Sequence, residues 1–173
     1  MRPKCLLIIN PVSGTASKKG VAAKCVRRLG REGIDVEVLY TEGPGDASRF
    51  AAEAARKEYL GVIAAGGDGT VNEVASSLRG TATALGIIPL GSGNGLARHL
   101  GLSTDVSEAL DVIVRRYILA CDSCEVNGRP FFCTFGLGFD AAVSEKFARS
   151  RQRGLINYMR SALGEYLKFQ PEE

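Results

Sequence analysis

Several features that mark other protein classes are missing from this sequence. It has no apolar run near the roughly 20 residues needed to span a bilayer. Its start, MRPKCLLIIN, has too short an apolar core for a signal peptide. Its 22 basic and 19 acidic side chains leave a net charge of only +3, too small an excess to indicate nucleic-acid binding. We therefore expect a cytoplasmic protein with no transmembrane segment and no nucleic-acid partner.

Patterns for metal binding and thiol redox chemistry are incomplete. Cys121 and Cys124 form a C-x-x-C pair, but a zinc site needs a second pair, which Cys133 and one distant histidine do not supply. A thioredoxin-type motif should open a helix after a strand, whereas this pair lies in a β-like run. We expect the five cysteines to be reduced and mostly buried, as small apolar residues.

Strand and helix patterns alternate four times along the first part of the chain. Apolar runs predict strands at residues 4–10, 34–41, 60–66 and 83–91, and helical spacing predicts helices at 16–33, 45–59, 70–78 and 105–115. The strands read as continuous apolar runs, which is typical of a parallel sheet covered by helices on both faces. We predict an α/β fold, with any ligand bound outside the carboxyl ends of the strands.

Acidic residues stand where three of the helices are expected to begin. Asp46 is a candidate N-cap of the second helix, and Asp105 with Glu108 fits a capping box for the last one. Thr70 and Glu73 also have the T-x-x-E spacing of a capping box. For these two residues, helix capping and ligand binding remain alternative interpretations.

The pattern changes after residue 116. Two β-like runs flank Asn127-Gly128, a pair suited to a two-residue hairpin turn. We predict an α/β domain at residues 1–116 and the start of a second, antiparallel domain at residues 117–173. A hairpin with helices makes a marginal domain on its own. The chain is therefore either a fragment or dependent on a partner such as a second copy in a homodimer.

Glycine-rich turns follow the third and fourth predicted strands. In the first, main-chain N–H groups of Gly67 to Thr70 are expected to face an anion at the positive end of the next helix. The second turn, PLGSGNGLAR, has the same design and adds the hydroxyl of Ser92. Two such turns on neighbouring strands indicate a phosphate ligand more strongly than either turn alone.

The acid within the first turn narrows the class of phosphate ligand. The chain has no G-x-x-x-x-G-K-[ST] motif, and NPVSG stands where a dinucleotide fingerprint should follow the first strand. Asp68 would repel a bare phosphate. Its carboxylate suits either a phosphate that carries Mg²⁺ or a hydroxyl that loses a proton during phosphoryl transfer.

Three motifs together resemble a known family. NPVSG at 10–14, GGDGTVNEV at 66–74 and PLGSGNGLAR at 89–98 are similar, in order and spacing, to the catalytic domain of diacylglycerol, sphingosine and ceramide kinases and their bacterial relatives. FGLGFDAAVSEKFAR resembles the start of that family's second domain. The resemblance implies a nucleotide-binding domain like that of NAD kinases and 6-phosphofructokinases, a β-rich lipid-binding domain, and ATP with Mg²⁺ as cofactors.

The resemblance also implies roles for particular residues. The positions matching the family's nucleotide site are Asn10, Ser13, Gly14, Thr41, Gly66, Gly67, Asp68, Gly69, Thr70, Asn72, Gly91, Ser92, Gly93 and Asn94. Asp68 corresponds to the general base of sphingosine kinases, whereas bacterial diacylglycerol kinases use a Glu late in the second domain, beyond this sequence. Asp140 corresponds to a contact with the polar head of the lipid, or is the N-cap of the following helix.

These observations together predict an ATP- and Mg²⁺-dependent kinase that phosphorylates a primary hydroxyl of a lipid. Which lipid accepts the phosphate stays open. A basic run at residues 146–153 is either a solvated helix end or a contact with an anionic membrane surface. The alternatives are a kinase of the same nucleotide-domain type acting on NAD or a sugar phosphate, a non-catalytic nucleotide-binding module, and a structural fragment that dimerises.

Overall fold

The fold was obtained as a computed structural model that describes residues 2–14, 18–139, 141–143 and 145. The chain divides into two compact units, Met1–Phe132 and Cys133–Glu173. The first unit contains all the elements described below. The boundary expected at residues 116/117 stays a prediction.

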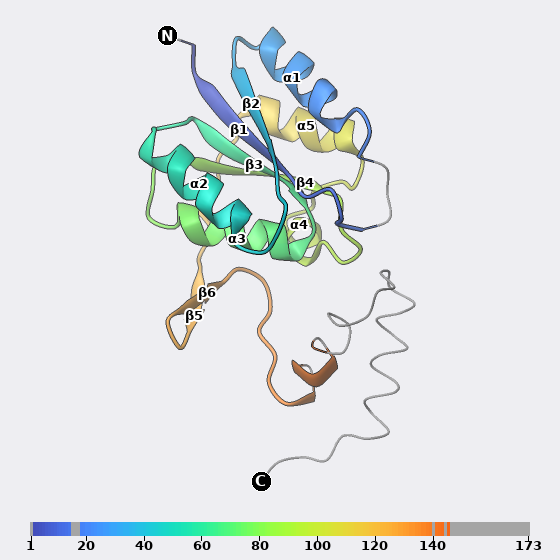
Figure 1. Cartoon of the computed structure of the whole chain (residues 1–173), viewed down its shortest axis with the longest axis vertical. Coiled ribbons are helices and arrows are strands. Elements are labelled where there is room, and N and C mark those ends of the chain that lie inside the picture. Colours follow the sequence, from blue (N-terminus) through green and yellow to red (C-terminus); the bar gives the residue numbers. More distant parts are fainter. Residues whose placement is uncertain (1, 15–17, 140, 144, 146–173) are drawn as a thin grey trace. The chain divides into compact units, whose positions relative to one another are not determined.

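The first unit is built around one sheet. Its strands β1 (Lys4–Ile9), β2 (Asp35–Tyr40), β3 (Gly61–Gly66) and β4 (Ala84–Pro89) are all parallel and lie in the order β2-β1-β3-β4. The helices are α1 (Val21–Arg31), α2 (Asp46–Arg56), α3 (Asp68–Leu78), α4 (Gly95–His99) and α5 (Val106–Arg115). Figure 1 shows α1 and α5 on one side of the sheet and α2 and α3 on the other.

The strand register brings the carboxyl ends of the strands to a common edge. Ile9 at the end of β1 lies opposite Tyr40 of β2 and Ala65 of β3, and Gly66 lies opposite Pro89 of β4. The chain runs outward from β1 to β2 and then returns past β1 to β3. The β1/β3 junction is therefore the point where the winding direction reverses, which is where ligands bind in open α/β sheets.

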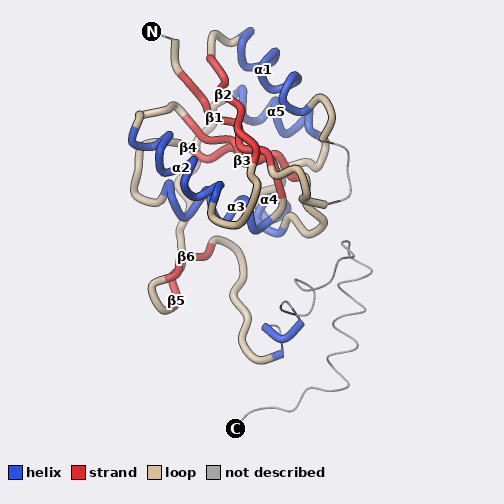
Figure 2. The backbone as a smooth tube through the Cα atoms, in the orientation of Figure 1, coloured by secondary structure: helices blue, strands red, loops and turns tan. Residues whose placement is uncertain are grey.

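Alternate residues of β1 serve two separate cores. Leu7 and Ile9 face α1 and α5, where they pack with Leu29 and Leu110. Leu6 and Ile8 belong to the other core, which α2 and α3 cover. A strand buried on both faces must be apolar at every position, which explains the continuous apolar runs in the sequence. The predicted α/β fold with a sheet covered on both faces is confirmed (Figure 2).

Three details differ from the prediction. Strand β2 is not a continuous apolar run, because Asp35 and Glu37 are exposed; it is an edge strand, where charged side chains discourage pairing with other molecules. Helix α3 begins at Asp68, two residues before the expected start at Thr70. The short helix α4 was not predicted, because its sequence lies within a glycine-rich stretch.

The helix caps test the acidic start signals one by one. Asp105 is the N-cap of α5, where its carboxylate accepts hydrogen bonds from the N–H groups of Ser107 and Glu108, as predicted. The prediction for Asp46 is wrong. The N-cap of α2 is Gly45, and the Asp46 carboxylate instead accepts from the N–H groups of Glu42 and Gly43 in the preceding turn.

The predicted hairpin is present but shorter than expected. Strands β5 (Cys124–Val126) and β6 (Arg129–Phe131) are antiparallel, and Asn127 and Gly128 both have positive φ, as a type I′ turn requires. The expectation that the cysteines are mostly buried is wrong for three of the five. All five are free, but Cys121, Cys124 and Cys133 are exposed. Within the described residues, no helix combines the length and apolar character needed to cross a membrane.

Candidate functional site

Three loops meet at the carboxyl edge of the sheet with their backbones in direct contact. A Cβ added at Gly91 would overlap the Cα of Gly67, and one added at Gly14, which has a φ of +56°, would overlap the carbonyl oxygen of Leu90. The loops after β1, β3 and β4 therefore form one unit. This close packing of the loops already requires glycine at both positions, whether or not a ligand binds.

A side-chain pair joins the first two loops at the β1/β3 junction. Asn10 donates from Nδ2 to Oγ1 of Thr70 at 3.1 Å, and its Oδ1 accepts from the N–H of Val12. Thr70 is buried over Gly66, where an added Cβ would lie 2.5 Å from Oγ1. Thr70 is thus not the cap of a capping box, because α3 begins at Asp68 with Gly67 as its N-cap.

Asp68 joins the first glycine loop to the second. Its Oδ1 accepts a hydrogen bond from the N–H of Gly95 at 2.6 Å, and a Cβ added at Gly93 would lie 2.8 Å from its Oδ2. The carboxylate is exposed to solvent at this edge. It can therefore anchor the second loop through one oxygen while its other oxygen faces Gly93.

The second loop is held closed by its own residues. Asn94 is buried in the left-handed conformation, accepts from the N–H of Gly91 at 2.9 Å and donates to its carbonyl oxygen at 2.8 Å. Arg98 donates from Nε to the carbonyl oxygen of Gly93 at 2.8 Å. These contacts shape the loop. The side-chain amide of Asn94 is hydrogen-bonded to Gly91 through both its oxygen and its nitrogen. Neither the Arg98 side chain nor the N–H of Gly95 was identified from sequence patterns as a group that holds the site.

The start of α3 is the part of the site that stays open. No side chain of a described residue caps this helix, so the N–H groups of its first turn stay available at a positive helix end. Gly69 lies within that turn, and a Cβ added there would meet nothing within 4 Å. The exposed side chains of Asn72 and Ser92 have no hydrogen bond to any other described residue. Together these groups can bind an anion through backbone and side-chain donors.

The remaining predicted positions lie at the same edge or outside the described part. Ser13 donates from its hydroxyl to the carbonyl oxygen of Asn10 at 3.1 Å, and Thr41 donates its N–H to the carbonyl oxygen of Ile9 at 3.0 Å. Thr41 is therefore beside the β1 loop. Asp140 and the basic run at residues 146–153 lie outside the described residues. Nucleotide binding by any of these positions stays a prediction.

Glu73 has a role that its sequence spacing did not suggest. Its carboxylate accepts from the N–H groups of Gly45 at 3.1 Å and Ser48 at 3.4 Å, at the start of α2. The hydroxyl of Ser48 donates back to the carbonyl oxygen of Glu73 at 3.1 Å. Glu73 therefore caps the neighbouring helix rather than its own, and fixes the loop after β2 against α3.

A bound divalent cation would have few protein ligands here. Among the described residues, no group of three or more His, Cys, Asp or Glu side chains could hold a metal ion. Asp68 is the first residue of α3 and places a carboxylate at the open start of this helix. One carboxylate suits Mg²⁺ bound mainly through phosphate oxygens and water, which is how Mg²⁺ usually accompanies nucleotides in proteins.

The fold and loops define an α/β protein with a parallel sheet, whose carboxyl edge carries two glycine-rich loops and the open start of α3. The chain belongs to the family of the diacylglycerol kinase catalytic domain, whose profile matches residues 4–126. This range holds all three glycine-containing loops.

Individual relatives agree with the family match. A Klebsiella pneumoniae protein named "Probable lipid kinase YegS-like" is 39% identical over 138 residues, covering 79% of this chain and 46% of that protein. A diacylglycerol kinase from Staphylococcus saprophyticus is 37% identical over 133 residues, covering 76% of this chain and 44% of that protein. The crystal structure of a Bacillus anthracis diacylglycerol kinase matches with a TM-score of 0.68 and 33% identity, over 75% of this chain and 48% of that one. The chain thus spans about half the length of these relatives.

Proposed function

We propose that the chain carries the nucleotide site of an ATP- and Mg²⁺-dependent lipid kinase, which transfers the γ-phosphoryl group to a primary hydroxyl of a lipid such as diacylglycerol or a sphingoid base. One observation carries this proposal. The first turn of α3 has no side-chain cap among the described residues, lacks a Cβ at Gly69, and lies against a second glycine loop. Such a surface lets phosphate oxygens approach main-chain N–H groups without steric hindrance. The names of the relatives support the lipid as acceptor.

The residues around this turn fit a polyphosphate. The N–H groups of the first turn would bind its oxygens, with Ser92 and Asn72 as further donors, while Asn10 and Asn94 hold the loops in shape. Bound ATP and Mg²⁺ would supply the phosphoryl group and neutralise most of its charge. The protein's contribution is to position the reactants in line and keep the loops rigid.

Asp68 has two assignable roles in this scheme. It is either a ligand of the magnesium ion or the base that accepts the proton of the lipid hydroxyl. In both, the contact between Oδ1 and the N–H of Gly95 fixes the carboxylate at the junction of the loops. The substitution Asp68→Asn keeps an oxygen that can accept from Gly95 but removes the charge. It therefore separates the chemistry of the carboxylate from its structural contact.

The test uses the chain and a version extended to the length of its relatives. We expect calorimetry to show ATP binding that requires Mg²⁺, and radiolabelled ATP to phosphorylate diacylglycerol or sphingosine in preference to NAD. Asp68→Asn should lower transfer by about 10²-fold or more, with an unchanged melting temperature. Absence of ATP binding to wild type, or wild-type turnover in Asp68→Asn, would contradict the proposal and the role of Asp68 respectively.

The other outcomes of the same assays identify the alternatives. Phosphorylation of NAD or a sugar phosphate, with no lipid product, would assign a kinase of the same nucleotide-domain type with a soluble acceptor. ATP binding without transfer in either length would assign a non-catalytic nucleotide-binding module. A lipid acceptor implies that the kinase acts at the cytoplasmic surface of a membrane. We also propose that the chain in isolation forms a homodimer, since Tyr117, Ile118 and Leu119 are large exposed apolar residues in succession.

A further inference from the structure

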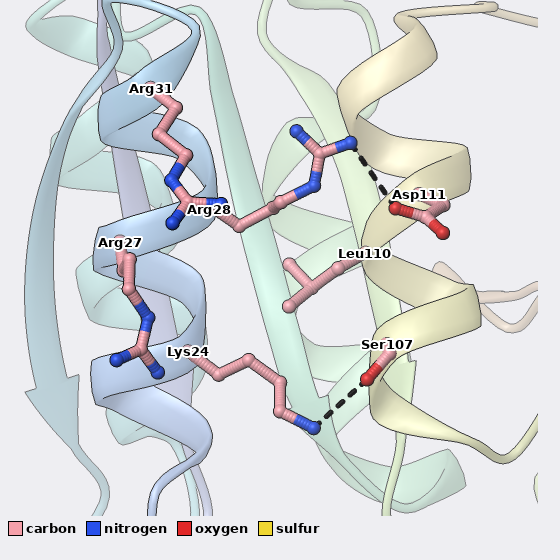
Figure 3. Close-up of a pocket in the computed structure, with 7 residues that line it drawn as sticks. All are labelled: Lys24, Arg27, Arg28, Arg31, Ser107, Leu110 and Asp111. Carbon is pink, nitrogen blue, oxygen red and sulfur yellow. Dashed lines mark hydrogen bonds and ion pairs between the residues drawn. The ribbon is translucent and has the colours of Figure 1, made fainter.

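A basic groove lies between α1 and α5, apart from the glycine loops. Its volume is about 210 Å³, and it is lined by Lys24, Arg27, Arg28, Arg31, Ser107, Leu110 and Asp111. The four basic residues follow one face of α1 at helical spacing, while Val21, Cys25 and Leu29 on the opposite face are buried. Figure 3 shows Lys24 and Arg28 reaching across to α5, with Leu110 between them.

The positive charges of this groove are only partly neutralised. Arg28 is paired twice, with Glu32 at 2.8 Å and with Asp111 at 3.3 Å. Lys24 donates to the Ser107 hydroxyl at 2.9 Å, and its charge also helps to lower the pKa of the Asp105 carboxyl. Arg27 and Arg31 form no hydrogen bond or ion pair with any other described residue. Two cations, Arg27 and Arg31, therefore face the groove without a carboxylate partner among the described residues.

We propose that this groove binds a phosphate group, as a phosphate monoester or diester, at a site separate from the nucleotide loops. Arginine presents planar donors that match phosphate oxygens in pairs, and Arg27 and Arg31 are one helical turn apart on the same face. Ser107 holds the Lys24 ammonium in the groove. An anion here would receive donors from α1 while Arg28 stays paired with α5.

Size and charge favour a single phosphate over larger anionic ligands. The volume of about 210 Å³ lies below the roughly 300–1,000 Å³ of pockets that enclose drug-sized ligands, so the groove would enclose only part of a nucleotide. The α5 wall carries Asp111, which would oppose a broad contact with a uniformly anionic surface. The chemistry thus fits one phosphate group, which either a soluble ester or a phospholipid head group could supply.

The experiment follows backbone amide signals of the ¹⁵N-labelled 173-residue chain during titration by NMR. The probes are inorganic phosphate and glycerol 3-phosphate, with vesicles of phosphatidylglycerol or phosphatidylcholine in a parallel sedimentation assay. We expect shifts in α1 and α5, and about tenfold weaker binding in the double variant Arg27→Gln/Arg31→Gln. Binding should also weaken when ionic strength rises from about 0.05 to about 0.5 M.

A second double variant controls for net charge. Arg2→Gln/Arg56→Gln removes the same two charges at exposed positions outside the groove and should bind the probes like wild type. Equal loss in both variants, shifts confined to the glycine loops, or no binding of any probe would overturn the proposal. Groove-dependent binding of the soluble esters assigns a soluble source, and groove-dependent binding of phosphatidylglycerol vesicles alone assigns the membrane. ATP binding is measured in parallel and should be unchanged in both variants, so failure here is separable from failure of the nucleotide site.

Discussion

Gly69 and Gly91 belong to the two glycine-rich turns after β3 and β4, but glycine is needed at the two positions for different physical reasons. At Gly91 the reason is internal, because a side chain would collide with the backbone of Gly67. At Gly69 nothing in the described structure lies within 4 Å of an added Cβ, and the residue sits inside a helix, where glycine is unfavourable. The proposed nucleotide would explain the choice at Gly69, because its phosphates would approach the helix start closely.

This difference gives a test in which stability and binding change in opposite directions. Gly69→Ala should stabilise the fold by about 0.5–1 kcal/mol, since alanine loses less backbone entropy in a helix. The same methyl group should weaken ATP binding, because it occupies the space next to the first-turn N–H groups. Thermal unfolding and calorimetric titration of the same samples measure both effects. Wild-type affinity in Gly69→Ala would show that no ligand comes close at this position.

Gly91→Ala is the matched control for the same chemical change. Its methyl group would overlap main-chain atoms of Gly67, which cannot rotate away as a side chain can. We expect a loss of about 1–3 kcal/mol of stability, together with weaker ATP binding, because the two loops would be forced apart. A melting temperature equal to wild type would contradict the backbone contact described here.

Glu73 of α3 contacts the start of α2, the helix that precedes α3 in the sequence. The T-x-x-E spacing pointed to a cap within α3, but the carboxylate binds the first N–H groups of α2 instead. Sequence spacing reports which residues are neighbours along one helix. It holds no information on a second helix start that packs nearby, and this explains why the capping interpretation, one of two left open, is wrong.

Removal of the Glu73 carboxylate should release the start of α2. Glu73→Ala is expected to destabilise the fold by about 1–2 kcal/mol, as for the loss of a helix cap, and to speed hydrogen exchange at Gly45 and Ser48. Exchange at Ser107, which a different carboxylate caps, should stay unchanged. Hydrogen-exchange NMR measures all three amides at once. Uniform acceleration throughout the first unit would instead indicate global destabilisation without a local role.

The Asp105 cap should make the stability of α5 dependent on pH. Hydrogen bonds from the N–H groups of Glu108 and Ser107 lower the pKa of this carboxyl below its ordinary value. The stabilising effect of the cap is therefore complete above the pKa of Asp105 in the unfolded chain, which is about 4. It is lost as pH falls through the lower pKa of Asp105 in the folded state.

Thermal unfolding of Asp105→Ala across pH tests this sign. The variant should melt a few degrees below wild type at pH 7, and the difference should shrink as pH falls below about 4. Asp105→Asn provides the control, because asparagine also caps helices but carries no charge. It should melt close to wild type at pH 7. A difference for Asp105→Ala that stays constant down to pH 2 would contradict an ionised cap.

Over the entire fold, the sequence predicted the structure correctly where a residue has the same kind of surroundings on every side. Strands such as β3 are buried on both sides, so their apolar runs predicted the sheet correctly. The glycine turns were placed correctly because strand order brings their ends together. The contacts of Asp68 with Gly95 and of Arg98 with Gly93 were not predictable, since they depend on how two loops pack in space.

The segment after α5 bears on how the isolated chain behaves in solution. Tyr117, Ile118 and Leu119 are 80%, 69% and 64% exposed and belong to no helix or strand. Neighbouring apolar side chains with this exposure favour association, because burial of each would contribute about 1.5–3 kcal/mol. The double variant Ile118→Ser/Leu119→Ser should therefore shift the chain from dimer towards monomer in light scattering, with little change in melting temperature. Val112→Ser, at an apolar position 42% exposed on α5, is the control and should leave the dimer intact. If wild type is already a monomer at high concentration, this segment is not a self-association surface.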